Sequence, residues 1–122
     1  MLHRMCTLLM LYLATAVGEV CAQLPVTASS IYDPRYQPEF AVDGDPNTRW
    51  ASRTNGAGEW LQIDFGESVP INSLSIAWEH AYAVEYEVQV SDDAQKWIVT
   101  RAVTDGKDET RALENLAAQA RY

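Results

Sequence analysis

The chain has 122 residues, a formal net charge of −8 and 48% hydrophobic residues. Its 17 acidic residues outnumber its 9 basic ones. This balance argues against nucleic acid, whose phosphates need a basic face, and against anionic membrane lipid held by charge alone.

The first 22 residues have the layout of a secretory signal peptide. His3 and Arg4 give a cationic start, and the apolar run Met5–Ala16 is about a dozen residues long, shorter than the ~20 that cross a bilayer. Small residues then lead to a cut after Ala22. We therefore predict a signal peptide at 1–22 and a secreted, extracellular domain at 23–122. An uncleaved anchor is the alternative.

Removal of this leader would also remove both cysteines, Cys6 and Cys21. The mature domain would then have no disulfide, although its compartment would permit one. A lipid anchor on Cys21 has weak support, because Glu19 and Val20 replace the small residues expected before a modified cysteine. About 100 residues remain, enough for one domain with a modest core.

The mature part is predicted to be all-β. Strands are expected at residues 26–30, 60–65, 71–78, 84–90 and 97–103, with loops at 31–40 and 53–59 and a polar connection at 91–97. The tail 110–122 is expected to form strand, loop, strand, although its Ala, Leu and Glu favour helix by propensity. Several short strands separated by turns indicate an antiparallel sandwich or barrel.

Alternation within these strands predicts which side chains face the core. The inward sets are Leu61, Ile63 and Phe65; Leu74, Ile76 and Trp78; and Val84, Tyr86, Val88 and Val90. Trp50 is expected in the core, with Trp60 and Trp97 in the core or packed on a sheet. Arg49 is expected to pair with a neighbouring carboxylate, and Asp64 to cap a turn.

The stretch "AVDGDPNTRW" at 41–50 has two interpretations. Asp43, Asp45 and Thr48 could offer oxygen ligands to Ca²⁺, with main-chain carbonyls of Phe40, Asp45 and Thr48 beside them. Alternatively, the two aspartates form side-chain turns with nearby amides, which is common for Asp-Gly-Asp. Spacing alone favours the ordinary turn.

The runs "VTASSIYDPRYQPEFAVDGDPNTRWAS", "EWLQIDFGE" and "AWEHAYAVEYEVQVSDDAQKW", followed by "ARY", resemble a discoidin domain. Discoidin domains are the coagulation factor five/eight type C domains, a class that includes the family 32 carbohydrate-binding modules. The resemblance covers about Val26 to Tyr122. It implies an antiparallel jelly-roll β-sandwich of the galactose-binding-domain-like class, incomplete at the C-terminus because the last strands of that fold are lacking.

The resemblance also favours the metal interpretation. It implies a structural Ca²⁺ held by Phe40, Asp43, Asp45 and Thr48. In such domains a late carboxylate completes the metal site, and that segment would follow Tyr122.

Ligand contacts are expected in loops at one end of the sandwich. A sugar is bound by an aromatic face together with directed polar groups. The loop after residue 77 concentrates such groups, and two further loops could supply the rim. The candidate ligand residues are Tyr32, Tyr36, Arg53, Trp78, Glu79, His80 and Tyr82. Trp78 could equally belong to the core, and His80 could be an ordinary surface residue.

The resemblance does not carry over a galactose-type specificity, because Glu79 or His80 stands where sugar-binding relatives commonly have an arginine. We predict a secreted, non-catalytic carbohydrate-binding module that tethers an extracellular protein to glycans or polysaccharide. A glycoside hydrolase in a longer product is the partner that the resemblance suggests. The alternative is an adhesive, protein-binding discoidin module. One mature histidine and no cysteine leave nucleophilic catalysis without its groups.

Overall fold

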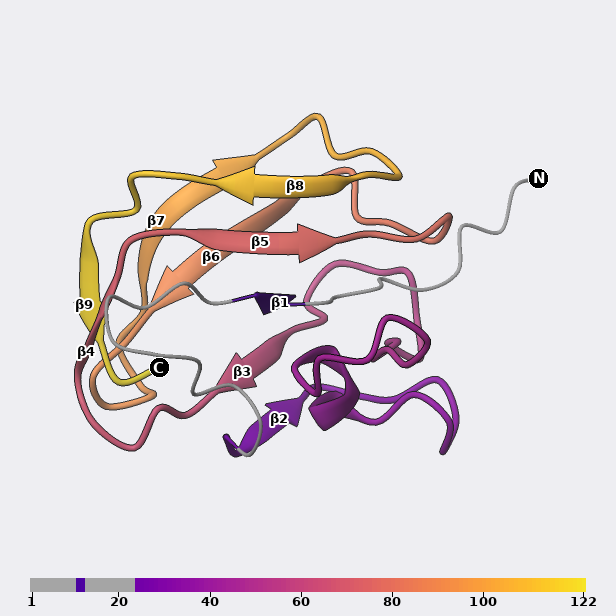
Figure 1. The fold of residues 1–122 in the computed structure, drawn as a ribbon, viewed down its shortest axis with the longest axis horizontal. Coiled ribbons are helices and arrows are strands. Elements are labelled where there is room, and N and C mark those ends of the chain that lie inside the picture. The colour runs from indigo at the N-terminus through magenta and orange to yellow at the C-terminus, as the bar shows by residue number, and fades with distance from the viewer. Residues whose placement is uncertain (1–10, 13–23) are drawn as a thin grey trace.

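The computed structural model describes residues 11–12 and 24–122 (Figure 1). Its elements are β1 (Leu11–Tyr12), β2 (Val26–Ala28), the 3-10 helix η1 (Pro38–Ala41), β3 (Leu61–Ile63), β4 (Val69–Ile71), β5 (Leu74–Ala77), β6 (Tyr86–Val90), β7 (Ile98–Val103), β8 (Thr110–Leu113) and β9 (Ala118–Ala120). Both cysteines and most of the expected signal peptide lie outside the described residues. Within the described part, no helix has the length and apolar character needed to cross a membrane.

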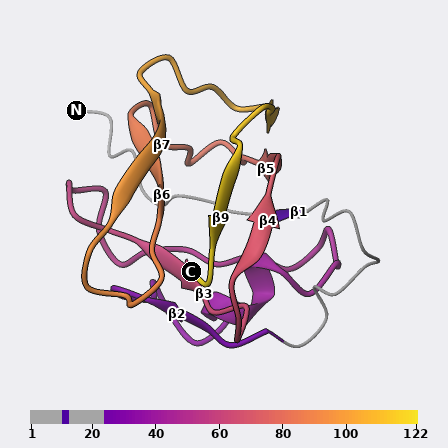
Figure 2. The same ribbon diagram turned by 90° about the vertical axis from the view of Figure 1, so that its left-hand side faces the viewer.

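All the strand pairs are antiparallel: β2 with β3, β4 with β9, β6 with β7, and β5 with both β1 and β8. Main-chain hydrogen bonds link the β2–β3, β4–β9 and β6–β7 pairs to one another. Phe65, after β3, donates to the carbonyl of Arg121 at 2.9 Å, and Tyr122 exchanges bonds of 2.9 and 3.1 Å with Ser91. Consequently β9 lies between β4 and β6, as Figure 2 shows.

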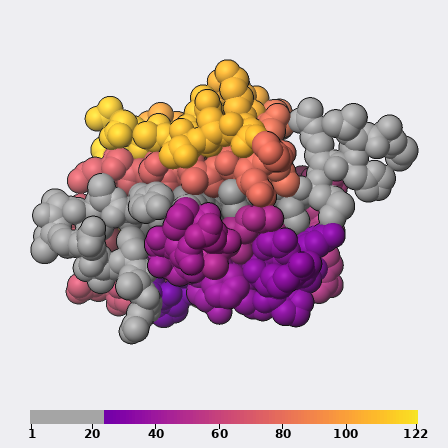
Figure 3. Space-filling view, turned by 45° about the vertical axis from the view of Figure 1, so that its right-hand side comes forward, coloured from indigo at the N-terminus to yellow at the C-terminus, as the bar shows by residue number. Residues whose placement is uncertain are grey.

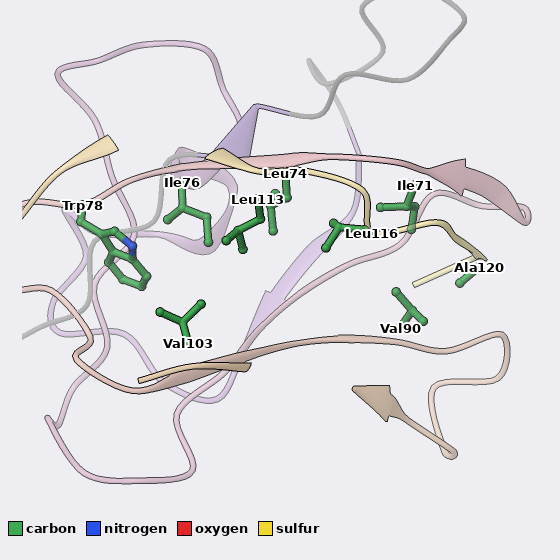
Figure 4. Packing of buried hydrophobic residues seen from close by; sticks show 9 residues of the cluster. All are labelled: Ile71, Leu74, Ile76, Trp78, Val90, Val103, Leu113, Leu116 and Ala120. Atoms are coloured by element: carbon green, nitrogen blue, oxygen red, sulfur yellow. The ribbon is translucent and has the colours of Figure 1, made fainter. Parts of the chain in front are cut away.

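The main core fills the space between β5–β8 and β6–β7. In Figure 4, Leu74 and Ile76 of β5 and Leu113 of β8 point toward Val90 of β6 and Val103 of β7. This arrangement confirms the predicted antiparallel β-sandwich, in which side chains from two facing sheets interdigitate.

A second core lies beneath the loops around β2 and β3. Trp50 is 2% exposed and packs with Ala41, Val42 and Ile63. Its indole Nε1 donates to the carbonyl of Ser30 at 2.9 Å, which satisfies the one polar atom of the ring. The core position predicted for Trp50 is confirmed.

Most predicted strand faces are confirmed. Ile76, Trp78 and Val90 are buried, and Glu87 and Gln89 of β6 are exposed. Val84 is instead exposed and precedes β6.

The core or sheet-packing positions expected for two tryptophans are wrong. Trp60 is 49% exposed on the outward side of the chain entering β3, and Trp97 is 37% exposed at the entrance to β7. Trp97 precedes β7, and its ring meets that of Tyr122 edge to face, with centroids 6.4 Å apart.

The tail forms β8 and β9 with a loop between them, so the predicted strand, loop, strand is confirmed. Asn115 and Ala117 have φ angles of 58° and 49°. A right-handed helix cannot continue through such left-handed residues. Strand pairing with β5 and β4 therefore overrides the local helix propensity.

Candidate functional site

Loops from three parts of the chain meet at one end of the sandwich. β2 and β5 both run toward this end in Figure 1, and the chain continues from them into residues 29–37 and 78–85. The N–H of Tyr32 donates to the carbonyl of Ala51 at 2.7 Å, which fixes the first loop to the segment before β3. Figure 3 shows the indigo-to-magenta segments as one continuous surface on this face.

Four side chains from these loops form a connected group, here called the tyrosine–arginine cluster: Tyr32, Tyr36, Arg49 and Glu79. The two tyrosine rings meet edge to face with centroids 5.9 Å apart. The Arg49 guanidinium lies 4.9 Å from the centre of the Tyr36 ring, and its Nε lies 3.2 Å from Oε2 of Glu79. Stacking and ion pairing thus hold Arg49 in one orientation.

The cluster remains accessible to a ligand. Tyr32 is 41% exposed, and the side chains of Arg49 and Glu79 are 32% and 40% exposed. An exposed aromatic ring beside a fixed donor and a fixed acceptor is the combination that binds a sugar ring.

The structure places Arg49 in this cluster, whereas the sequence predicted only that it pairs with a carboxylate. The expectation that it pairs with a carboxylate is confirmed, but the partner is Glu79, 30 positions along the chain. No periodicity or motif joins residues 49 and 79, so only the folded chain brings them together.

Two predicted ligand residues pack in or against the main core. Trp78 is 8% exposed, with its ring centre 5.0 Å from that of Tyr86, and Tyr82 is partly buried against the same core. The ring faces of Trp78 are therefore covered by protein, so the core interpretation holds for this residue and it cannot serve as a sugar platform.

His80 and Arg53 lie on the surface. His80 Nδ1 contacts Oδ2 of Asp108, while 94% of the histidine side chain is exposed. Arg53 is exposed, and its main-chain N–H donates to Oγ of Ser30 at 2.9 Å. Neither residue contacts the tyrosine–arginine cluster in the bonds described, and their ligand roles stay predictions.

Glu59 ties together the loops that carry the site. Its Oε2 accepts from the hydroxyls of Ser29 and Ser30, the latter at 2.7 Å, and its Oε1 accepts from the hydroxyl of Thr54 at 2.7 Å. These bonds, led by that of Ser29, outweigh desolvation and hold the pKa of Glu59 below its ordinary value of 4.5. The sequence reasoning missed this residue.

The stretch 43–48 folds into a tight turn in which oxygens from three residues converge. The Thr48 hydroxyl lies 2.6 Å from Oδ2 of Asp43, to which it donates, and 3.1 Å from the main-chain oxygen of Asp45. Gly44 has a φ angle of 76°, which suits glycine.

Both aspartates also make the side-chain turns that the alternative interpretation predicts. Asp43 accepts from the N–H of Asp45 at 2.9 Å, and Asp45 accepts from the N–H of Asn47 at 2.8 Å. The carboxylate of Asp45 is thus engaged with Asn47, while its main-chain oxygen lies near Thr48.

The oxygen atoms of this turn are of the types that bind Ca²⁺, since carboxylate, hydroxyl and carbonyl oxygens are its usual ligands. Among the described residues, no three of the His, Cys, Asp and Glu side chains come together. An ion here would therefore depend on Asp43, Thr48 and main-chain oxygens, with Phe40 in η1 as the remaining candidate. The calcium site stays a prediction.

Three comparisons place the domain among known proteins. The family model described as F5/8 type C domain matches residues 25–122. Among solved structures, chitosan-binding module 2 from the chitosanase/glucanase of Paenibacillus sp. IK-5, determined with chitotriose, superposes with a TM-score of 0.79. It is 29% identical in sequence, over 84% of this chain and 82% of that module.

Two curated relatives share sequence with the chain. Discoidin, CUB and LCCL domain-containing protein 2 of Rattus norvegicus is 35% identical over 95 residues, which is 67% of this chain and 12% of the relative. The polysaccharide lyase 8 family protein HylA of Enterococcus faecalis is 38% identical over 64 residues, 52% of this chain and 4% of the relative. The match thus spans a small part of each relative. Because the family model matches nearly the whole of the described sequence, the chain belongs to the F5/8 type C (discoidin) domain family.

Proposed function

We propose that this domain is a carbohydrate-binding module for a chitosan-type, amino-sugar polysaccharide. The observation that carries the proposal is the tyrosine–arginine cluster, an exposed Tyr32 beside the fixed Arg49–Glu79 pair. The likeness to chitosan-binding module 2, determined with chitotriose, supports the same ligand class. The polysaccharide lyase relative supports glycan binding more broadly.

Each part of the cluster has a role in this proposal. The ring of Tyr32 stacks on the C–H face of a sugar, and Tyr36 holds both Tyr32 and Arg49 in place. Arg49 donates to sugar hydroxyl or ring oxygens. Glu79 accepts from a hydroxyl or an ammonium group, a contact that is stronger when the donor is charged.

The charge of the chain favours a cationic glycan. A formal net charge of −8 attracts protonated amino groups at long range, and salt screens that attraction. A neutral polysaccharide gains nothing from this field, and an acidic one is repelled. Affinity should therefore fall as ionic strength rises.

The proposal also covers where the domain acts and what kind of protein it belongs to. The domain is non-catalytic and secreted, and it keeps a longer extracellular protein, such as a glycoside hydrolase, close to its polysaccharide. A shallow, solvent-exposed site gives weak single contacts, and useful affinity then arises from tethering to a polymer. Ca²⁺ bound by Asp43, Thr48 and nearby carbonyls of Phe40 and Asp45 would stabilise the loop that leads to Arg49.

The test is a binding assay of the whole chain against insoluble chitosan, chitin and cellulose at two salt concentrations. We expect retention on chitosan, weakened by salt, and loss of retention in Tyr32→Ala and Glu79→Gln. Val84→Ala is the matched control, because Val84 is an exposed apolar residue outside the cluster. Equal retention on all three polymers would contradict the amino-sugar specificity. No binding to any of them would refute the module function and direct attention to protein partners.

A further inference from the structure

Trp60 has an exposed indole at the loop end of the β2–β3 pair. Ala28 and Leu61 form the last registered pair of these strands. Beyond it, the N–H of Ser29 donates to the carbonyl of Trp60 at 3.0 Å, and the N–H of Trp60 donates to Oγ of Ser29 at 2.9 Å. Trp60 thus lies where the chain leaves β2 for the loop that carries Tyr32.

The distance between the two aromatic residues is bounded by the chain. Tyr32 follows Ser29 by three residues, and a fully extended chain spans at most about 3.6 Å per residue. The backbone of Tyr32 is therefore within roughly 11 Å of Ser29, which contacts Trp60 directly. One extended oligosaccharide can reach both rings.

The segment between them is held rigidly. Glu59, next to Trp60, accepts from the hydroxyls of Ser29, Ser30 and Thr54, and Ser30 Oγ also accepts from the N–H of Arg53. The backbones around Trp60 and Tyr32 are consequently fixed relative to each other before a ligand arrives. Such preorganisation lowers the entropy loss on binding.

The Trp60 indole presents a large apolar ring to solvent. Trp60 is 49% exposed, the most exposed of the tryptophans in the described residues. Large aromatic rings dominate binding energetics where they are accessible. No described ring lies in stacking contact with Trp60, whereas Trp97 is engaged with Tyr122.

We infer that Trp60 is a second stacking surface for the glycan, so that the site extends from the tyrosine–arginine cluster across the Ser29–Ser30 segment to Trp60. This inference rests on the proposed function. Short oligosaccharides occupy the cluster alone, and longer ones also cover Trp60. Glu59 acts as a positioning residue by fixing Ser29 and Ser30.

The experiment measures the dissociation constants of glucosamine, chitotriose and a longer chitosan oligosaccharide for the whole chain and its variants. In Trp60→Ala we expect the longer ligand to bind about two- to tenfold more weakly, the range for loss of one aromatic contact. The affinity for glucosamine should not change. The wild type should gain affinity with ligand length, and the variant should lose that gain.

Trp97→Ala is the matched control, because it also removes an exposed tryptophan. Trp97 belongs to the connection from β6 to β7, which lies at the other end of the sandwich from the loops after β2 and β5 (Figure 1). This control variant should bind every ligand as the wild type does. Thermal unfolding of both variants separates a loss of fold from a loss of contact. As a second readout, the longer ligand should protect Trp60 from a soluble fluorescence quencher.

Each outcome decides one question. If Trp60→Ala binds every ligand as tightly as the wild type does, the extended site is refuted while the module function stands. The same holds if the variant binds every ligand more weakly by the same factor. If the wild type binds none of these sugars, the proposed function itself fails.

Discussion

Arg121 and Asp64 form a two-bond salt bridge between segments 57 positions apart in the sequence. Arg121 Nε lies 2.8 Å from Oδ1 of Asp64, and Nη2 lies 3.0 Å from Oδ2. Asp64 also accepts from the N–H of Gly66 at 2.7 Å, which confirms the predicted turn cap. The bridge fastens the end of β9 to the end of β3, beside the Phe65–Arg121 main-chain bond.

This bridge predicts a loss of stability in acid. The bond from Arg121, and after it that from Gly66, hold the pKa of Asp64 below its ordinary value of 3.8. A carboxyl whose pKa is lowered by folding stabilises the folded state above its unfolded pKa, and that contribution is lost as pH falls through the folded pKa. Asp64→Asn should therefore unfold more easily at neutral pH and lose less stability below about pH 4 than the wild type does.

Chemical denaturation at pH 7 and pH 3 measures this difference. Asp33→Asn is the matched control, since Asp33 pairs with Arg35 only two residues away and joins no distant segments. It should lower neutral-pH stability less than Asp64→Asn. Identical denaturation curves for wild type and Asp64→Asn at both pH values would contradict a stabilising role for the bridge.

Replacing Gly106 by Ala should disturb the loop that carries Glu79. An added Cβ at Gly106 would lie 2.0 Å from the carbonyl oxygen of Ala83, so main chain must move. Overpacking of this kind typically destabilises by about 1–3 kcal/mol. We expect a lower unfolding midpoint and weaker glycan binding, because residues 78–85 shift.

Gly56→Ala serves as the comparison for this variant. Its Cβ would meet only the Thr54 hydroxyl at 3.6 Å, an ordinary contact. This variant should unfold and bind like the wild type. A Gly106→Ala protein with wild-type stability and binding would show that the loop accommodates the clash without consequence.

Calcium should raise the unfolding temperature if the turn at 43–48 binds it. A ligand that binds only the folded state stabilises it by roughly 2.7 kcal/mol when its free concentration is about a hundredfold above Kd. The increase should vanish with chelator and in Asp43→Asn, and it should persist in Asp92→Asn, which changes an exposed aspartate in another loop. A midpoint indifferent to calcium and chelator would make the stretch an ordinary turn.

Trp50→Ala should be strongly destabilising. Trp50 is 2% exposed and donates to Ser30, and removal of a buried tryptophan typically costs about 3–5 kcal/mol. Trp60→Ala removes a ring of the same size from the surface and should change stability far less. Urea denaturation followed by circular dichroism compares the two, and equal losses would contradict the assigned burial.

Secretion should remove residues 1–22 and with them β1. Expression in a secreting host, followed by mass spectrometry, should find the mature protein in the medium with Gln23 as its first residue. Because Leu11 and Tyr12 pair with Ile76 and Ser75, their removal leaves that edge of β5 unpaired. Amide exchange in β5 should then be faster in 23–122 than in 1–122, whereas retention of the leader inside cells would refute export.

The sequence by itself determined the features that repeat along the chain. Alternating side chains in β5 and β6 predicted the buried Ile76 and Val90, because a strand turns successive residues to opposite faces. The order of motifs identified the family. The sequence also singled out Tyr32, Tyr36 and Glu79 as candidate ligand residues, and the structure brings these three together.

Only the tertiary structure decided what depends on contacts between distant residues. It joined Arg49 to Glu79 and Glu59 to Ser29, placed Trp78 inside, and left Trp60 and Trp97 on the surface. Local spacing holds no information on which strand covers a given ring or which carboxylate meets a given arginine. Those outcomes follow from how the sheets pack and how the loops at their ends are brought together.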